Sequence, residues 1–182
     1  MRILILSSSP RKSSLTHRGA LFLKGELDKR PEHHSEVVDL RDWETGYLQE
    51  VWQTHETTPD KFKPLFDKIH SADVFIIVTP EYNGLFSPAL SAVLDQFPKT
   101  MYIRKAFGIV SASTGALGGM RGAMHLQQYI LGLFGIPSPQ MLLIGNIDKR
   151  INPQGHSSEE ILIKQSVNFL NELIWLGTRL RS

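Results

Sequence analysis

The sequence contains no cysteine among its 182 residues, which excludes disulfide bridges, thiolate metal ligands and cysteine nucleophiles. It also lacks long apolar runs. The first such run, residues 3–6, is shorter than the roughly 7–15 apolar residues of a secretory signal, and no segment approaches the ~20 residues of a membrane helix. We therefore expect a cytoplasmic protein that does not enter a membrane.

The sequence also has no large excess of either sign of charge. Lys and Arg number 20 and Asp and Glu 18, so the formal net charge is only +2. The basic residues are scattered along the chain, and nucleic acid is not an expected partner. His33 and His34 lie in a polar stretch and His125 has no acidic neighbour at ligand spacing, so we expect no metal site. The length and the 41% hydrophobic content are typical of one globular domain, residues 1–182.

Short apolar runs alternate with stretches of helical spacing along the chain. This alternation is typical of a parallel sheet with helices on both faces. We predict an α/β fold with five parallel strands in the doubly wound order 2-1-3-4-5, where ligands bind beyond the carboxyl ends of strands 1 and 3. The predicted strands are 3–6, 37–40, 74–79, 107–111 and 141–144, and the predicted helices are 15–29, 61–70, 89–97, 119–134 and 158–179.

Several residues carry more local predictions. Ser157 and Glu160 have the spacing of a capping box at the start of the last helix, and Gly177 indicates its end. The irregular segment 41–59 holds Trp43, Tyr47 and Trp52, of which we interpret the two tryptophans as packing or interface residues. We expect Met124 and Leu131 at a subunit interface, because they lie off the core face formed by Ala123, Leu126, Ile130 and Leu133.

The loop after the first strand carries hydroxyls and cations at the start of a helix. Residues 7–16 read Ser-Ser-Ser-Pro-Arg-Lys-Ser-Ser-Leu-Thr. Free N–H groups and the helix dipole favour an anion there, and Arg11 can bind phosphate oxygens in a bidentate fork. We interpret the loop as a phosphate site; the alternative is an ordinary serine-rich helix cap. It has neither the Gly-x-Gly-x-x-Gly of dinucleotide folds nor the Gly-Lys-Ser/Thr of the P-loop.

Two further loops point to the same edge of the sheet. In residues 80–84, Pro-Glu-Tyr-Asn-Gly, Tyr82 offers an aromatic surface and Asn83-Gly84 can take positive φ, which suits the edge of a flat heteroaromatic ring. The glycines of residues 113–119 allow the backbone to approach a ligand closely. Each loop alone could be an ordinary turn or connector, but the predicted topology brings all three to one crevice.

Together these loops resemble the NADPH-dependent FMN reductase family of flavodoxin-like proteins. The family's Gly-Ser-x-Arg-x-x-Ser-x-Asn is matched by residues 8–16, its Pro-Glu-Tyr-Asn-Gly in full by residues 80–84, and its Gly-x-x-Gly-Gly-x-Arg by residues 115–121. The resemblance runs from residue 1 to about residue 145. This sequence departs from the family at Ser8, Ser91 and Gln96, where the family has Gly, Lys and Trp.

The resemblance implies a flavodoxin-like domain with FMN, in which NADPH or NADH donates electrons to a flavin, quinone, azo compound or similar acceptor, and a homodimer or homotetramer. It implies that Ser9, Arg11, Ser14 and Thr16 bind the FMN phosphate, with Leu15 beside them. It places the isoalloxazine against Pro80, Glu81, Tyr82, Asn83 and Gly84, and its other edge against Ser113, Thr114, Gly115, Gly118 and Gly119. No side chain is assigned as general acid or base, because the chemistry belongs to the cofactor.

Two alternatives remain on the same fold. A flavodoxin-type electron carrier would bind FMN without its own NAD(P)H reductase activity, but such carriers tend to be acidic and this chain is not. A receiver-like signalling module needs an acidic cluster after the first strand and a phosphoacceptor Asp at the end of the third. Ser7 and Thr79 stand at those places.

Overall fold

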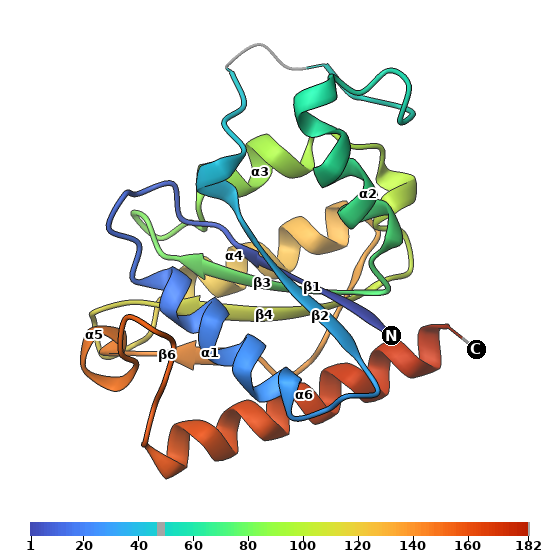
Figure 1. Ribbon diagram of the computed structural model, residues 1–182. Helices are drawn as coiled ribbons and strands as arrows, with labels where there is room; N and C mark the ends of the chain where they lie inside the picture. Colours follow the sequence, from blue (N-terminus) through green and yellow to red (C-terminus); the bar gives the residue numbers. More distant parts are fainter. Residues whose placement is uncertain (47–49, 182) are drawn as a thin grey trace.

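The computed structural model describes residues 1–46 and 50–181, and a parallel sheet forms its centre (Figure 1). The strands lie in the order β2-β1-β3-β4, and two short strands, β5 and β6, both pair with β4 at the far edge. Their bounds are Arg2–Ser7 (β1), His34–Asp39 (β2), Val74–Pro80 (β3), Ala106–Ala112 (β4), Ile136–Pro137 (β5) and Leu142–Ile144 (β6).

The predicted strand order is confirmed, with one difference at the edge. The fifth position is divided: β5 pairs with the start of β4 and β6 with its end, so the described residues form six strands and not five. The segment between them, residues 138–141, reads Ser-Pro-Gln-Met. Because proline has no N–H to donate to a ladder, Pro139 interrupts the pairing after β5.

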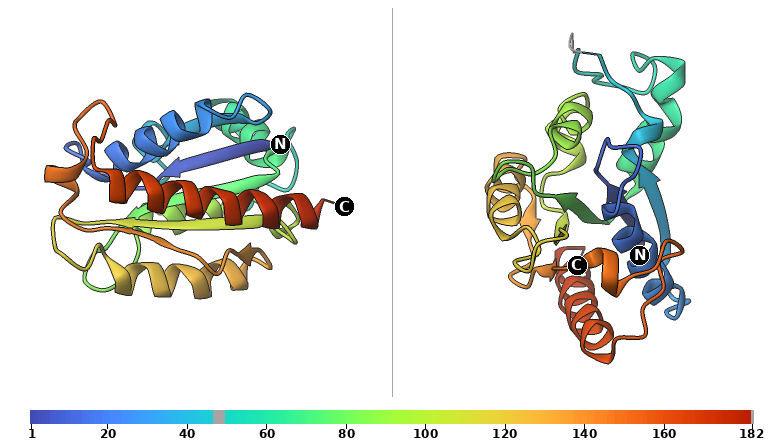
Figure 2. Two further views of the ribbon diagram at one scale, coloured as in Figure 1. Left: turned by 90° about the horizontal axis from the view of Figure 1, so that it is seen from below. Right: turned by 90° about the vertical axis from the view of Figure 1, so that its left-hand side faces the viewer.

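Helices cover both faces of the sheet (Figure 2). α1 and α6 pack on one face, whereas α2, α3 and α4 pack on the other. The helices are Thr16–Asp28 (α1), Lys63–Ser71 (α2), Pro88–Leu94 (α3), Met120–Gly132 (α4), Ile147–Arg150 (α5) and Glu160–Leu180 (α6), with short 3₁₀ helices at Leu40–Asp42, Asp60–Phe62 and Lys99–Met101. This confirms the predicted α/β architecture.

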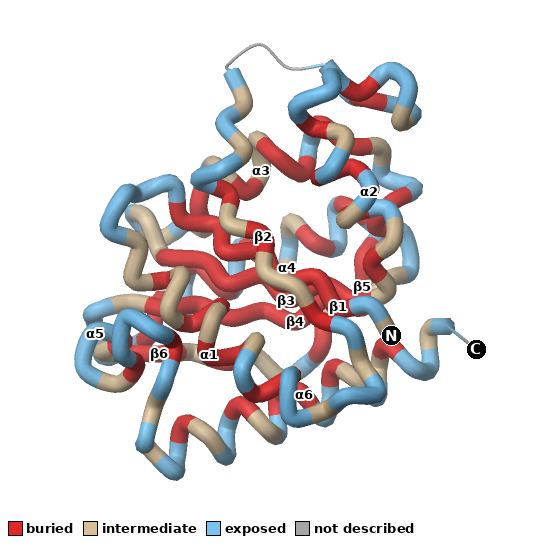
Figure 3. The backbone as a smooth tube through the Cα atoms, viewed as in Figure 1, coloured by how far each residue is buried: buried red, intermediate tan, exposed pale blue. Residues whose placement is uncertain are grey.

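The central strands serve two cores at once. In β1, Ile3 and Ile5 belong to the core under α1 and α6, while Leu4 and Leu6 belong to the core under α2, α3 and α4. Figure 3 shows β1, β3 and β4 buried along most of their length. Since both faces need apolar side chains, these strands appear in the sequence as continuous apolar runs.

The predicted core face of α4 is confirmed, because Ala123, Leu126 and Ile130 are fully buried and Leu133 is nearly so. The predicted start of α6 is wrong. Its N-cap residue is Glu159 and no side chain caps it, while the Ser157 hydroxyl accepts from the backbone N–H of Glu159 at 3.2 Å. The Glu159 carboxylate accepts two hydrogen bonds from Arg150, the backbone of Glu159 is extended, and the helix begins at Glu160.

The predicted last residue of α6, 179, is within one residue of the observed end, but the interpretation of Gly177 as the end of the helix is wrong. The helix continues to Leu180, and Gly177 is buried within it. A Cβ at Gly177 would lie 2.5 Å from Cγ2 of Val74. The glycine therefore lets α6 approach β3 closely and does not end the helix.

The aromatic residues before α2 pack as expected. The Trp52 ring lies 4.7 Å from that of Phe62 and 5.5 Å from that of Phe97, and Trp43 lies 6.2 Å from Phe62. Tyr47 lies outside the described residues. Among the described helices, none is long and apolar enough to cross a membrane.

Three loops leave the sheet at its carboxyl edge. β1 ends at Ser7, which pairs with Val78 of β3, and β3 ends at Pro80, which pairs with Ala112 at the end of β4. After β1 the chain turns toward β2, and after β3 it turns toward β4 on the other side. This is the topological switch point at which ligands bind in open α/β sheets.

Candidate functional site

The three loops line one crevice at this switch point. Its lining residues are Ser9, Arg11, Ser13, Ser14, Leu15, Thr16, Pro80, Glu81, Tyr82, Ala112, Ser113, Thr114 and Ile147. The structure thus brings together residues nominated from all three loops. Asn83 and Gly84 line a neighbouring groove beside α4, and Gly115, Gly118 and Gly119 are not among the residues that line the crevice.

Ser13, Ala112 and Ile147 line the crevice although sequence reasoning did not nominate them. Ser13 and Ala112 flank nominated residues, so taking whole loops would have included them. Ile147 belongs to no motif. It begins α5, the next element after β6, and its N–H donates to the carbonyl of Ser113 at 3.2 Å. Only the position of α5 beyond the neighbouring strand could have indicated it.

The loop formed by residues 7–16, called the phosphate loop after the role predicted from the sequence, is anchored at both ends. At Ser8, where the resembling family has Gly, both the backbone N–H (3.0 Å) and the hydroxyl (3.2 Å) donate to the carbonyl of Val78. At the other end, the Ser14 hydroxyl accepts from the N–H of His17 at 3.2 Å. A hydroxyl that accepts one bond keeps its own O–H free to donate, so Ser14 can still bind an anion.

The electrostatics of the phosphate loop favour an anion. No acidic residue lies in the first turn of α1 or between Ser7 and Thr16. The positive end of the helix dipole therefore meets no carboxylate on its own loop. Arg11 adds a full positive charge, and its guanidinium lies 4.2 Å from the centroid of the Tyr82 ring. The Ser9 hydroxyl is hydrogen-bonded to the Tyr82 hydroxyl at 3.0 Å.

The second loop forms a tight hairpin. Tyr82 and Leu85 exchange two backbone hydrogen bonds, of 2.8 and 3.0 Å. Between them Asn83 (φ 53°) and Gly84 (φ 88°) both have positive φ, as the sequence predicted. Two consecutive residues with positive φ match the type I′ turn, for which Asn-Gly is a preferred pair. The turn fixes Tyr82 at the mouth of the crevice.

Glu81 joins the second loop to α4. Its carboxylate accepts from the backbone N–H groups of Arg121 (3.1 Å) and Gly122 (3.3 Å), and from the Arg121 guanidinium at 3.0 and 2.7 Å. Burial raises the pKa of Glu81, but these hydrogen bonds and the charge of Arg121 outweigh it, so the pKa lies below its usual value. The carboxylate thus complements the helix N-terminus.

Replacing Glu81 by glutamine is expected to lower the free energy of unfolding by about 1 kcal/mol at pH 7. Because the pKa of Glu81 is depressed in the folded state, its stabilisation is complete above the unfolded value, 4.5, and is lost as pH falls through the folded value. Urea unfolding at pH 7 and pH 4 should show the Glu81→Gln penalty shrinking at the lower pH. The control is Glu172→Gln on the exposed face of α6. An equal penalty for both variants would contradict this role.

The third loop depends on two glycines with positive φ. Gly118 (φ 61°) and Gly119 (φ 77°) take the chain into α4, of which Gly119 is the N-cap. A Cβ on Gly118 would lie 2.9 Å from the backbone nitrogens of Ile144 and Gly145. The glycines hold the third loop close against β6, and so fix the position of Ser113 and Thr114.

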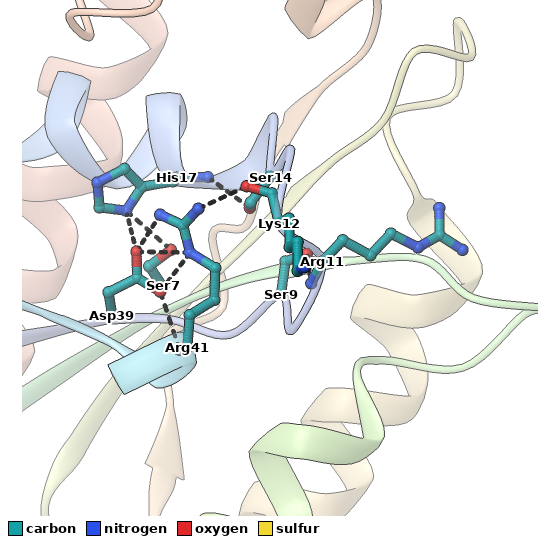
Figure 4. A network of polar contacts seen from close by, with 8 residues as sticks. All are labelled: Ser7, Ser9, Arg11, Lys12, Ser14, His17, Asp39 and Arg41. Carbon is teal, nitrogen blue, oxygen red and sulfur yellow. Dashed lines mark hydrogen bonds and ion pairs between the residues drawn. The ribbon is translucent and has the colours of Figure 1, made fainter. Parts of the chain in front are cut away.

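Ser7, His17 and Asp39 are residue types of a hydrolytic triad, but their geometry excludes one. Both Ser7 Oγ (3.2 Å) and Asp39 Oδ2 (3.1 Å) lie at the same ring nitrogen, Nδ1 of His17 (Figure 4). A triad needs the serine and the carboxylate on opposite nitrogens. Ser7 is also fully buried. Within residues 1–46 and 50–181, no group of three or more His, Cys, Asp or Glu could hold a metal ion.

The fold and the crevice define a flavodoxin-like α/β protein in which a loop rich in hydroxyls, with Arg11, lies beside an aromatic side chain. The profile of the NADPH-dependent FMN reductase family matches residues 1–148. The chain belongs to this family. It is accordingly an FMN-dependent oxidoreductase with a reduced nicotinamide as its electron donor.

The chain is also similar to individual relatives and, in its fold, to solved structures. An FMN-dependent NADPH-azoreductase of Staphylococcus aureus is 27% identical over 182 residues, which cover 94% of this chain and 96% of the relative. The fold is similar to that of FerB, a flavoenzyme NAD(P)H:(acceptor) oxidoreductase from Paracoccus denitrificans, with a TM-score of 0.77 at 18% identity and 97% coverage of both chains. It is also similar to a flavodoxin from Pseudomonas aeruginosa, with a TM-score of 0.56 at 14% identity and full coverage of both chains.

Proposed function

We propose that this protein holds FMN in the crevice, with the phosphate on the phosphate loop and the isoalloxazine against the second and third loops. One observation supports this placement above the others. The first turn of α1 has no acidic residue, and beside it Arg11 lies over the Tyr82 ring while the Ser9 hydroxyl is hydrogen-bonded to the Tyr82 hydroxyl. These groups fit the cofactor, because a phosphomonoester dianion needs hydrogen-bond donors and positive charge, and a flavin ring needs a flat apolar neighbour.

Each loop has a separate task in this proposal. The hydroxyls of Ser9, Ser14 and Thr16 donate to phosphate oxygens, Arg11 neutralises their charge, and Leu15 packs beside them. Pro80, Glu81, Tyr82, Asn83 and Gly84 position one side of the ring, and the third loop closes the other side through Ser113, Thr114, Gly115, Gly118 and Gly119. FMN, when bound, supplies the redox chemistry, and the protein binds and orients it.

For the acceptor, we propose a small aromatic compound, with azo compounds and quinones as the first to test. The relatives named azoreductases support this choice. The test is steady-state turnover of the FMN-loaded protein with NADPH and either an azo dye or a benzoquinone. We expect parallel double-reciprocal lines, because donor and acceptor react in separate half-reactions. Retained FMN without turnover of either acceptor would instead favour an electron carrier that needs a protein partner.

We also propose a homodimer formed along α4. Met120, Met124 and Leu131 of this helix are about half exposed, as is Phe134 just beyond it, and large apolar side chains on one exposed helix favour burial against a second copy. Sedimentation at micromolar concentration should give twice the monomer mass, and Met124→Asp should halve it. A monomeric wild-type protein would overturn this proposal.

Finally, we propose that residues 1–182 work as one domain in the cytoplasm, where NADPH is available. The packing of α6 against the sheet supports one domain, because Phe169 and Leu173 belong to the same core as β1, β3 and β4. Gly108 of β4 makes this packing possible, since a Cβ there would lie 2.6 Å from Cδ2 of Leu173. Removal of α6 should therefore leave no cooperatively folded protein in a thermal melt.

A further inference from the structure

A cluster of three polar side chains, Asp39, Arg41 and His17, lies behind the phosphate loop, outside the crevice. Asp39 ends β2, Arg41 follows it in the 3₁₀ helix Leu40–Asp42, and His17 lies in the first turn of α1. Figure 4 shows the side chains of these residues converging on the Asp39 carboxylate, whereas the side chain of Arg11 extends away from it. None of these residues lines the crevice.

Asp39 is the centre of this cluster. Both of its oxygens accept from Nε of Arg41 at 3.0 Å, Nη2 of Arg41 donates to Oδ2, and Nδ1 of His17 lies 3.1 Å from Oδ2. The side chain of Asp39 is only 11% exposed. Burial raises the pKa of Asp39, but the hydrogen bonds from Arg41 and the neighbouring positive charges lower it below its usual value. Two side chains, Arg41 and His17, thus hold the Asp39 carboxylate, and each of them contacts a different part of the chain.

Both partners connect Asp39 to the phosphate loop. Nη1 of Arg41 donates to the carbonyl of Lys12 at 2.9 Å, in the exposed middle of the loop. His17 contacts the loop at both ends, through Ser7 Oγ at 3.2 Å from its ring and Ser14 Oγ at 3.2 Å from its backbone N–H. A single carboxylate on β2 therefore reaches the middle of the loop through Arg41 and its start through the His17 ring, while the backbone of the same His17 holds Ser14 at its end.

We propose that Asp39, through Arg41 and His17, is a positioning residue that preorganises the phosphate loop for the FMN phosphate. The inference rests on the proposed placement of the phosphate. A loop already held in its binding conformation does not lose that conformational freedom on binding, and so binds the phosphate more tightly. Asp39 contributes to FMN affinity although its own charge repels a phosphate.

The charge of Asp39 and its positioning role are expected to change FMN affinity in opposite directions, so a substitution can tell them apart. By Coulomb's law alone, removing a carboxylate near the phosphate loop should strengthen the binding of a dianion. If Asp39 positions the loop, Asp39→Ala should weaken it. We expect the Kd of FMN to rise about tenfold in Asp39→Ala and by less in Arg41→Ala, which leaves the contact between Asp39 and His17 in place. The Asp39→Ala/Arg41→Ala double variant should bind FMN no more weakly than Asp39→Ala, because Arg41 acts through Asp39.

The experiment titrates the protein with FMN and with riboflavin, which has the same ring and no phosphate, and follows flavin fluorescence. Riboflavin affinity should stay within about twofold in all variants, since the second and third loops are unchanged. The control is Arg181→Ala. It removes an arginine that pairs with Asp73 at 3.4 Å, just before β3 begins and so at the amino ends of the strands, away from the crevice. It should change neither affinity. Thermal melts check that each variant is folded. If Asp39→Ala does not fold, the comparison of FMN with riboflavin is made with Arg41→Ala, because Arg41 is an exposed residue.

The possible outcomes distinguish a failure of the positioning role of Asp39 from a failure of the proposed phosphate site. FMN affinity that is unchanged or improved in Asp39→Ala, while the wild-type protein prefers FMN to riboflavin, would overturn the positioning role alone. An equal loss for FMN and riboflavin would also overturn it, because the network would then support the whole crevice and not the phosphate loop. A wild-type protein that binds both flavins equally would overturn this inference and the proposed phosphate site together.

Discussion

Replacement of Arg11 by alanine is expected to raise the Kd of FMN about thirtyfold and to leave that of riboflavin nearly unchanged. Hydrogen bonds between charged groups contribute roughly 1.5–3 kcal/mol, and each 1.4 kcal/mol corresponds to a tenfold change in affinity. Arg11 lines the crevice at the start of α1, beside Tyr82, and its fork of N–H donors suits a phosphate. The measurement is titration of the apoprotein with both flavins.

A matched control for Arg11 lies next to it. Lys12 carries the same charge and is also exposed, but it does not line the crevice. Lys12→Ala leaves its carbonyl available to Arg41 and should weaken FMN binding less than about threefold, through screened charge alone. Equal losses for Arg11→Ala and Lys12→Ala would mean that net charge, and not a directed hydrogen bond, attracts the phosphate. Loss of riboflavin affinity equal to that of FMN would contradict the phosphate assignment of Arg11.

The second large effect is expected at Gly145, which follows β6 and supports the third loop. A Cβ at this position would lie 2.3 Å from the carbonyl oxygen of Ala116 and 2.8 Å from its carbonyl carbon. Backbone atoms cannot rotate away as a side chain can, so Gly145→Ala must displace the third loop. We expect the free energy of unfolding to fall by about 2–3 kcal/mol, with a lower Tm and weaker binding of both flavins.

The control for Gly145 is a glycine with free space around it. Gly25 lies inside α1, and no atom lies within 4 Å of a Cβ built there. Gly25→Ala should raise the free energy of unfolding by about 0.5–1 kcal/mol, because alanine favours helix and restricts the unfolded chain. Differential scanning calorimetry of the two variants should therefore show opposite shifts in Tm. Similar shifts would mean that the contact between Gly145 and Ala116 does not constrain the loop.

The sequence predicted the central sheet well because its signals are local. Buried parallel strands need apolar residues on both faces, so β1, β3 and β4 are continuous apolar runs whose order follows from the strand–helix alternation. The Asn83-Gly84 turn was predictable for the same reason, since its positive φ values are a property of two adjacent residues.

Features that depend on distant contacts could not be predicted. The start of α6 depends on the ion pair between Arg150 and Glu159, and the position of Gly177 depends on β3. The restraint on the phosphate loop by Asp39 joins residues from β2 and α1 that no sequence motif connects. Ile147 lines the crevice only because α5 follows β6. Asp39 and Gly177 lie far along the chain from their partners. Arg150 and Glu159, and Ile147 and β6, are closer in sequence, but their spacing belongs to no motif that would link them.

Reduction of the bound flavin by a nicotinamide is tested most directly by anaerobic mixing of the FMN-loaded protein with NADPH, followed by the visible absorbance of the flavin. We expect this absorbance to bleach rapidly, much faster than that of free FMN under the same conditions. We also expect Arg11→Ala mixed with one equivalent of FMN to bleach more slowly than the wild-type protein at equal protein concentration, because less of the FMN is bound. Wild-type protein that retains FMN and is bleached by neither NADPH nor NADH would contradict the account.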